Sequence, residues 1–499
     1  MIKIVLKVRS YLCLFILCIC SGNTIGQENR TNPPNVVLII ADDVSFDDLG
    51  AYGNPFVQTP NIDELAKNGL KFNNAILTTS SCSPSRISII TGRYPHNTGA
   101  AELHTQPKVA FESIASKLRA KGYYTGQAGK WHMGKLLKQG FDRIYAKPGE
   151  IGDGGEARWL PSLKERDKNK PFFFWFASID AHREWGENEF SDTHDPEEIE
   201  VPATLIDDDS TRIDLARYYD EIKRFDFHIG EVVKELKKQK VYDNTVIIVM
   251  SDNGRPFPRD KTRMYHSGIK TPLIIHWPEG IEGERVSNSL VSSIDIAPTI
   301  LDICGIEPPE TFQGKTFKAL FDHPDKDFRK YAFAEHNWHD YEAHERMVRT
   351  KKHLYILNSR PELPNQGPLD IVNSPSFRSL VKAGKEGKLS PAQSDVFVAP
   401  RPAEELFVLK DDPLQVRNVV NKKSLKGEKL KKQNELIRSQ LRDVLTAWME
   451  ETGDDIPGEL TGDWYTRDTG EKIEKNFRKR GEMPGEKENA DRSEEKGRF

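Results

Sequence analysis

The sequence predicts an α/β fold in which a large, mostly parallel sheet is covered by helices on both faces, with a smaller C-terminal α+β subdomain. Five runs of strand length are apolar on both faces, as buried strands of a parallel sheet are. They lie at 35–40, 123–128, 171–177, 245–250 and 273–276. Segments with helical spacing and a polar face separate them, at 59–69, 111–122, 211–238 and 295–303. With 499 residues, the chain can bury a large core and form more than one domain.

The character of the sequence changes near residue 331. Segments 347–358 and 404–410 are predicted strands of a smaller antiparallel sheet, and 425–451 is a predicted amphipathic helix. Beyond residue 458 the chain is mostly Lys, Glu, Arg, Asp and Gly, which indicates either a solvated, mobile tail or a loosely packed extension. We therefore expect a first unit at 27–330, a C-terminal subdomain at 331–457 and a charged tail at 458–499.

Residues 1–26 have the pattern of an export signal. A basic start precedes an apolar stretch at 11–20, and small residues precede a cut at Gln27. The apolar stretch is too short to span a bilayer, so no transmembrane segment is expected. A lipoprotein cut at Cys20 is the alternative, although Ile19 is bulky where a small residue is usual. We expect an exported protein, periplasmic or secreted.

The charge and cysteine content of the sequence limit the kinds of partner that the protein could bind. The formal net charge of −4 and the pI near 6.4 give no overall attraction to nucleic acid or to an anionic membrane. A polyanionic substrate would need a local basic pocket. After loss of the signal the chain keeps two cysteines, Cys82 and Cys304, which excludes a disulfide scaffold.

Chemically active residues follow four of the predicted strands. They are Asp42 and Asp43, Lys130 and His132, His182 and Arg183, and Asp252 and Asn253. The carboxyl ends of parallel strands meet at one edge of a sheet, where ligands bind, so these residues indicate a single site. Three carboxylates and one amide oxygen are ligands that suit Ca²⁺ or Mg²⁺ rather than zinc. Lys130 could hold an anionic oxygen, and His132 could move a proton.

The stretch around Cys82 is predicted to form a short helix. Ser83 is a good N-cap, Pro84 suits the first helical position, and Gly92 suits the end. Cys82 would then lie at a helix N-terminus, which favours anions and would acidify a thiol.

At this point the motifs resemble a known family. Residues 82–86, Cys-Ser-Pro-Ser-Arg, resemble the C-x-P-S-R motif of type I sulfatases, within the alkaline-phosphatase-like superfamily. The segments 91–96 and 35–43 match that family in order and spacing, and the resemblance covers about 35–452. It implies that the first unit is a catalytic sulfatase domain.

The resemblance also implies a cofactor and a modified nucleophile. Cys82 would be oxidised to formylglycine (3-oxoalanine) by a formylglycine-generating enzyme or an anaerobic maturase. A hydrated aldehyde offers one hydroxyl for attack on sulfur and a second whose deprotonation ejects sulfate. Asp42, Asp43, Asp252 and Asn253 would bind one Ca²⁺ together with the modified Cys82.

Roles carried over by motif complete the implied site. Arg86 would fix the diol, His132 would be the base for sulfate release, and His182 the acid that protonates the leaving group. Lys130 and Lys261 would hold sulfate oxygens, whereas Lys270 would pack nearby. Four further residues are candidates for a substrate-binding rim: His104, Arg183, His266 and His336.

The subfamily leaves alternatives open. Segments 252–258 and 261–265 resemble the N-sulfoglucosamine sulfohydrolases (sulfamidases), but those tend to carry Arg where this chain has Lys261. We therefore expect hydrolysis of O-sulfate esters on a sulfated carbohydrate, an algal polysaccharide such as ulvan or a glycosaminoglycan. The alternatives are a sulfamidase, a phosphodiester or phosphonate hydrolase of the same superfamily, and an inactive glycan-binding relative.

Overall fold

The computed structural model describes residues 32–420 and 427–497, so the predicted export signal lies outside the described residues. Its main sheet has the strand order β5-β4-β6-β1-β7-β8-β2-β9. The strands are β1 (Asn35–Ala41), β2 (Leu70–Phe72), β4 (Tyr124–Gly129), β5 (Arg143–Tyr145), β6 (Phe172–Ala177), β7 (Thr245–Ser251), β8 (Leu273–His276) and β9 (Arg285–Ser287). Within the described part of the chain, β8 alone runs against its neighbours in this sheet. The predicted mostly parallel sheet is confirmed.

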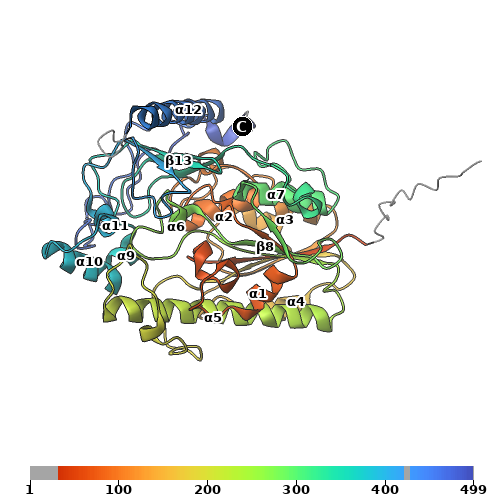
Figure 1. Cartoon of the computed structure of the whole chain (residues 1–499). Helices are drawn as coiled ribbons and strands as arrows, with labels where there is room; N and C mark the ends of the chain where they lie inside the picture. Colours follow the sequence, from red (N-terminus) through yellow and green to blue (C-terminus); the bar gives the residue numbers. More distant parts are fainter. Residues whose placement is uncertain (1–31, 421–426, 498–499) are drawn as a thin grey trace, which may run out of the picture.

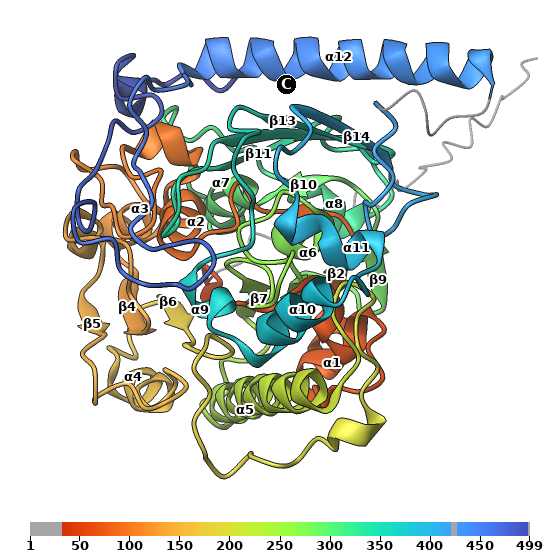
Figure 2. The same cartoon turned by 90° about the vertical axis from the view of Figure 1, so that its left-hand side faces the viewer.

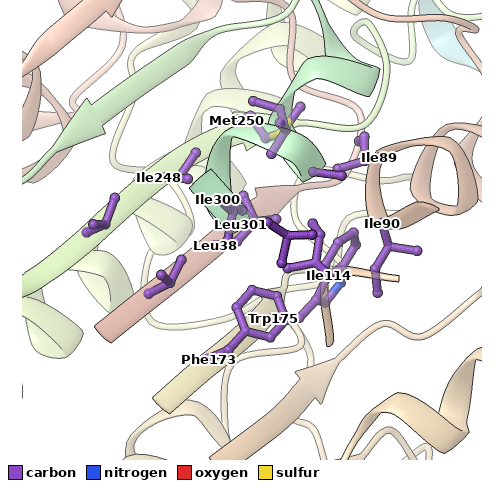
Figure 3. Packing of buried hydrophobic residues seen from close by; sticks show 14 of the residues in the cluster. Leu38, Ile89, Ile90, Ile114, Phe173, Trp175, Ile248, Met250, Ile300 and Leu301 are labelled. Atoms are coloured by element: carbon purple, nitrogen blue, oxygen red, sulfur yellow. The ribbon is translucent and has the colours of Figure 1, made fainter. Parts of the chain in front are cut away.

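Helices cover both faces of this sheet (Figure 1). On one face lie α2 (Cys82–Thr91), α3 (Ile114–Ala120) and α7 (Ile296–Ile303). On the other lie α1 (Pro60–Lys67), α4 (Trp159–Glu165) and α5 (Asp209–Lys238), and α10 (Pro375–Lys385) packs against α5. Because side chains alternate along a strand, Leu38 of β1 packs in the first core, with Ile89 of α2 (Figure 3), and Val37 in the second.

The register of the central strands aligns their carboxyl ends. Ala41 of β1 pairs with Ser251 of β7, and Ile40 pairs with Ala177 of β6. Gly129, the last residue of β4, pairs with the same Ala177. The residues that follow these strands therefore leave the sheet side by side.

A second, antiparallel sheet lies above the helices α2 and α7, at the top of Figure 2. It consists of β11 (Ala332–His336), β12 (Glu345–Arg349), β13 (His353–Asn358) and β14 (Glu404–Val408). One face packs on the main domain, and the other is covered by α12 (Glu428–Thr452) through Leu445 and Trp448. The predicted antiparallel subdomain with its helix is confirmed.

The remaining elements are short. They are the parallel pair β3 (Ala75–Ile76) and β10 (Val291–Ser292), and the helices α6 (His266–Ile269), α8 (Ala319–Asp322), α9 (Leu369–Val372) and α11 (Pro391–Ser394). Among the described residues, no helix is long and apolar enough to cross a membrane.

The charged C-terminal segment 458–497 packs on the body of the molecule. Figure 2 shows it in dark blue, running from the end of α12 past α2 and α3. Trp464 stacks at a tilt on Trp338, with ring centroids 4.4 Å apart, and Arg93 donates a 2.5 Å hydrogen bond to the carbonyl of Ser493. Although rich in charge, this segment is held by aromatic and hydrogen-bonded contacts.

Candidate active site

Helix α2 begins at Cys82, its N-cap is Ser81, and every residue of the helix is buried. The prediction that Ser83 caps this helix is wrong. Proline is tolerated throughout the first turn, where backbone N–H groups lack helical partners, so the helix starts two residues before Pro84. The Ser83 hydroxyl instead accepts a 2.9 Å hydrogen bond from the backbone N–H of His104. Gly92 ends the helix with a left-handed φ of 63°, as predicted.

Cys82 lies against the carboxylates that follow β1. Its Sγ is 3.6 Å from Asp42 Oδ1 and 4.0 Å from Asp43 Oδ1, and all three side chains are buried. Burial raises the pKa of the Cys82 thiol well above its ordinary value, although Lys130 and Lys261 oppose the shift. The expected acidification by the helix N-terminus is therefore overcome by desolvation, and an unmodified Cys82 would be a poor nucleophile at neutral pH.

Asp252 and Asn253, which follow β7, complete the acidic group. Asp252 Oδ1 accepts a 3.3 Å hydrogen bond from the backbone N–H of Asp43. The Asn253 amide nitrogen donates to Asp43, whereas its buried Oδ1 has no hydrogen-bond partner in the described structure. Burial raises the pKa of Asp252 to about 7, against the opposing effect of Arg86.

Three cations surround these carboxylates. Arg86 Nε lies 2.6 Å from Asp252 Oδ2, Lys130 Nζ contacts Asp42, and Lys261 Nζ lies 2.7 Å from Asp43 Oδ2. Burial acts to raise the pKa of Asp42, but Lys130 and Arg86 bring it well below its ordinary value. The group thus holds three carboxylates and three cationic side chains beside Cys82, each cation in contact with a carboxylate.

His132 and His104 form a pair beside this group. His104 Nδ1 and His132 Nε2 are 2.8 Å apart. Burial, together with Lys130, brings the pKa of His132 well below its ordinary value, so its ring is neutral at pH 7 and can accept a proton. Asp43, His104 and His132 all have left-handed φ angles, of 64°, 62° and 49°, a conformation that residues other than glycine adopt uncommonly.

His182 faces a residue that the sequence did not single out. Its Nδ1 contacts the backbone carbonyl of Arg183, and its Nε2 is 3.9 Å from Asp370 Oδ2 on α9. Asp370 Oδ2 also lies 3.0 Å from Lys261 Nζ. One carboxylate, more than 100 residues later in the sequence than either, therefore lies beside both His182 and Lys261. No motif marks Asp370, which is an isolated acid in the first turn of a short helix.

The structure separates the four candidate rim residues. His104 lies in the site, but the Arg183 guanidinium is already held by Asp214, at 2.7 and 2.8 Å, and by the carbonyl of Pro256. His266 accepts from Arg349 under the second sheet, and His336 is buried beside Glu345 in a different cavity. Only His104 of the four is therefore placed with the predicted catalytic residues.

Comparison with known protein families identifies the family to which a chain with this group of residues belongs. A family model described as Sulfatase matches residues 34–153 and 157–306, which include every residue of the acidic group and its three cations. The chain belongs to the sulfatase family. The chain is therefore a sulfuric ester hydrolase. A second model, described as N-sulphoglucosamine sulphohydrolase, C-terminal, matches residues 257–362.

Relatives of this sulfatase act on different sulfated molecules. An ulvan-active sulfatase of Formosa agariphila is 28% identical over 89% of this chain and 81% of its own length. The human N-sulphoglucosamine sulphohydrolase is 29% identical over 85% of this chain and 91% of its own length.

Solved structures share the fold. One, in complex with its substrate D-glucosamine-2-N,6-O-disulfate, has a TM-score of 0.63 at 21% identity and covers 84% of this chain and 98% of its own. The phosphonate monoester hydrolase of Agrobacterium radiobacter has a TM-score of 0.62 at 18% identity, covering 85% and 98%. At these identities the likeness shows the fold alone.

The residues of this sulfatase fit a hard divalent cation. Asp42, Asp43 and Cys82 present donor atoms within 4.8 Å of one another, all buried. The buried Asn253 Oδ1 has no hydrogen-bond donor in the described structure, so it is an oxygen ligand available to a cation. An oxygen-rich donor set of this kind suits Ca²⁺.

Proposed function

We propose that this sulfatase hydrolyses O-sulfate esters on a sulfated polysaccharide or its oligosaccharides, with Cys82 converted to formylglycine and one Ca²⁺ bound at the acidic group. The observation that carries this proposal is the contact of Cys82 with Asp42 and Asp43 at the aligned ends of the central strands, with Lys261 bound to Asp43. Asp42, Asp43, Asp252, Asn253 and the modified Cys82 would hold the ion.

The modified Cys82 and the cation would supply an attacking oxygen and a positive charge for the sulfate group. Lys130 and Lys261 would bind the outer sulfate oxygens, since both ammonium groups point at the carboxylates beside Cys82. Arg86, held by Asp252, would orient the nucleophile. Charge stabilisation of this kind is strongest in a buried site, and Asp42, Asp43 and Arg86 are all fully buried.

Two histidines would move the protons. His132 is neutral at pH 7 and would accept the proton whose loss releases sulfate. His182 would protonate the leaving alcohol from Nε2, the nitrogen that faces Asp370 and is not occupied by the Arg183 carbonyl.

A polar groove beside Asp370 supports an extended, anionic substrate. The groove has a volume of about 520 Å³ and is lined by Asp370, Arg217 and Arg378. Both arginines are exposed, and neither forms an ion pair in the described structure. Glu184 is an acid that lines the same groove. A neighbouring sugar that carries a sulfate or carboxylate would suit this groove.

We further propose export to the periplasm or the medium through the segment 1–26, and maturation of Cys82 by a formylglycine-generating or anaerobic maturase. An exported location agrees with a substrate too large to enter a cell.

The test compares sulfate release from substrates that share one scaffold. With protein whose Cys82 peptide has the mass of formylglycine, we expect faster release from O-sulfated oligosaccharides than from N-sulfoglucosamine, and little hydrolysis of an aryl phosphate diester. Cys82→Ser should fold and lose turnover, whereas Cys304→Ser should keep it, because Cys304 packs against the apolar core.

A faster reaction with N-sulfoglucosamine would instead favour the sulfamidase alternative, which the second family match supports. A faster phosphate reaction, or an unmodified Cys82 thiol in protein from the native host, would contradict the proposal.

A further inference from the structure

The charged C-terminal segment reaches the active site through one side chain, that of Arg480. Its Nη1 donates a 2.9 Å hydrogen bond to Glu102 Oε2, and its Nη2 donates a 2.7 Å bond to the backbone carbonyl of Leu103. The guanidinium lies over two indole rings, 4.1 Å from the centroid of Trp338 and 4.5 Å from that of Trp464. Because the two indole centroids are themselves 4.4 Å apart, both rings lie on the same side of the guanidinium, and its position is fixed by these rings together with the bonds to Glu102 and Leu103.

The contacts of Arg480 fall on the turn that carries His104. The backbone N–H of Thr105 donates to the carbonyl of Glu102, which closes the turn, and His104 adopts its left-handed φ of 62° within it. The same turn is tied to α2 by the bond from the His104 N–H to Ser83 Oγ, one residue after Cys82. The His104 ring then contacts His132 at 2.8 Å.

The buried carboxylate of Glu102 links the turn to the C-terminal segment. Its side chain is 1% exposed, and Arg480 and Thr461, both from the C-terminal segment, supply the hydrogen bonds to Oε2. A buried carboxylate that loses its cationic partner strongly destabilises the folded protein. The pairing of Glu102 with Arg480 therefore holds the turn and the C-terminal segment together. Without Arg480 the left-handed turn would lose its bonds to Glu102 Oε2 and the Leu103 carbonyl and would keep only those to Ser83 and within the turn.

We propose that Arg480 is a positioning residue, which holds the 102–104 turn so that His104 orients the His132 ring toward the sulfate site. The C-terminal segment is thereby a part of the active site and not a solvent-exposed appendage. This inference rests on the proposed role of His132. A misplacement of about 1 Å at a reacting group can cost about 100-fold in rate, so the effect on turnover should be large.

The experiment uses the full-length, matured protein and a small aryl sulfate, which reaches none of the outer contacts. Arg480→Ala should lower kcat about 10- to 100-fold and change KM less than about threefold. Guanidinium chloride at millimolar concentration should restore part of the rate, because removal of the side chain leaves a space beside the Trp338–Trp464 pair and the Glu102 carboxylate that a guanidinium ion fits. The matched control is Lys479→Ala, an exposed cation next in sequence, which should behave as wild type.

A double variant tests whether the effect passes through His104. In a His104→Ala background, Arg480→Ala should add nothing further to the loss in kcat. A wild-type kcat in Arg480→Ala would overturn the inference. So would a loss that guanidinium does not rescue and that adds fully to His104→Ala, because such a loss is only structural.

A crystal structure of Arg480→Ala separates this inference from the proposed function. A lost contact between His104 and His132 supports the positioning role whatever the turnover, and an unchanged contact contradicts it. Failure of the wild-type protein to release sulfate would count against the proposed function instead.

Discussion

At the scale of single residues, the site is governed by which cation faces which carboxylate. Lys261 lies between Asp43 and Asp370, at 2.7 and 3.0 Å. Burial acts to lower its pKa, but Asp370 and Asp43 raise it well above the ordinary value, so Lys261 stays charged throughout the neutral range. Lys270, nine residues later, lies over the ring of Phe46 instead, and burial brings its pKa down to about 8.

This difference predicts unequal effects of two lysine substitutions. Lys261→Ala should lower kcat/KM about 100- to 1,000-fold, the usual loss when a charge-stabilising donor is removed from an active site. Lys270→Ala should leave kcat/KM within about threefold of wild type, because its ammonium contacts an aromatic ring away from the site. Steady-state kinetics on one aryl sulfate measures both. Equal losses in the two variants would show that Lys261 has no special role.

At the scale of elements, a buried network joins the main domain, the second sheet and α12. Glu335 of β11 accepts a 2.8 Å bond from the His96 ring, which follows α2, and its Oε2 lies 3.9 Å from Arg346 of β12. His96 in turn contacts Thr452 at the end of α12 at 3.0 Å. Burial acts to raise the pKa of Glu335, but His96 and Arg346 bring it down to about 2.

The lowered pKa of Glu335 makes the stability of the folded protein depend on pH. Glu335 is ionised in the folded protein well below the pH at which an unfolded glutamate, near 4.5, takes up a proton. Its stabilisation is therefore complete above about pH 4.5 and is lost as the pH falls toward 2. Glu335→Gln should lower Tm at pH 7, since breaking a buried pair costs about 3–5 kcal/mol.

Calorimetry across the pH range checks this expectation. The difference in Tm between wild type and Glu335→Gln should shrink as the pH falls from 4.5. The control Glu488→Gln, at an exposed position, should leave Tm unchanged. A difference that grows on acidification would contradict the assigned ionisation.

The elements also show what sequence reasoning could and could not reach. Continuous apolar runs predicted the bounds of β1, β6 and β7 to within a residue or two, because strands buried on both faces have no polar positions. Motif spacing then brought Asp42, Cys82 and Asp252 together. Asp370 and Arg480 were out of reach, since each is an isolated charge whose role depends on tertiary contacts with distant segments. His266 and His336 illustrate the converse, in that nearness to a motif in sequence did not place them in the site.

At the scale of the whole molecule, the acidic group ties together the centre of the fold. Asp42 and Asp43 extend β1, Asp252 and Asn253 extend β7, and Cys82 opens α2. A cation held by all of them binds the folded chain and not the unfolded one, so it stabilises the fold by mass action, about 2.7 kcal/mol at 100 times its Kd.

Metal removal should therefore lower stability as well as activity. We expect EDTA to lower Tm and added Ca²⁺ to restore it, and the response to vanish in Asp252→Asn. The affinity for Ca²⁺ should fall as the pH drops below about 7, because protons compete for the Asp252 carboxyl. Thermal scans at pH 6 and pH 8 measure this dependence. An identical Tm with EDTA and with Ca²⁺ would contradict a calcium site here.

The burial of Cys82 sets an order of events during synthesis. The side chain is 2% exposed, and Trp338 and Trp464 help to cover it. Both tryptophans leave the ribosome long after Cys82, the second of them within the last tenth of the chain. The thiol is therefore open to a modifying enzyme on the nascent chain and closed to it once translation and docking are complete, so the proposed oxidation of Cys82 would have to take place while the polypeptide is still being made or is still unfolded.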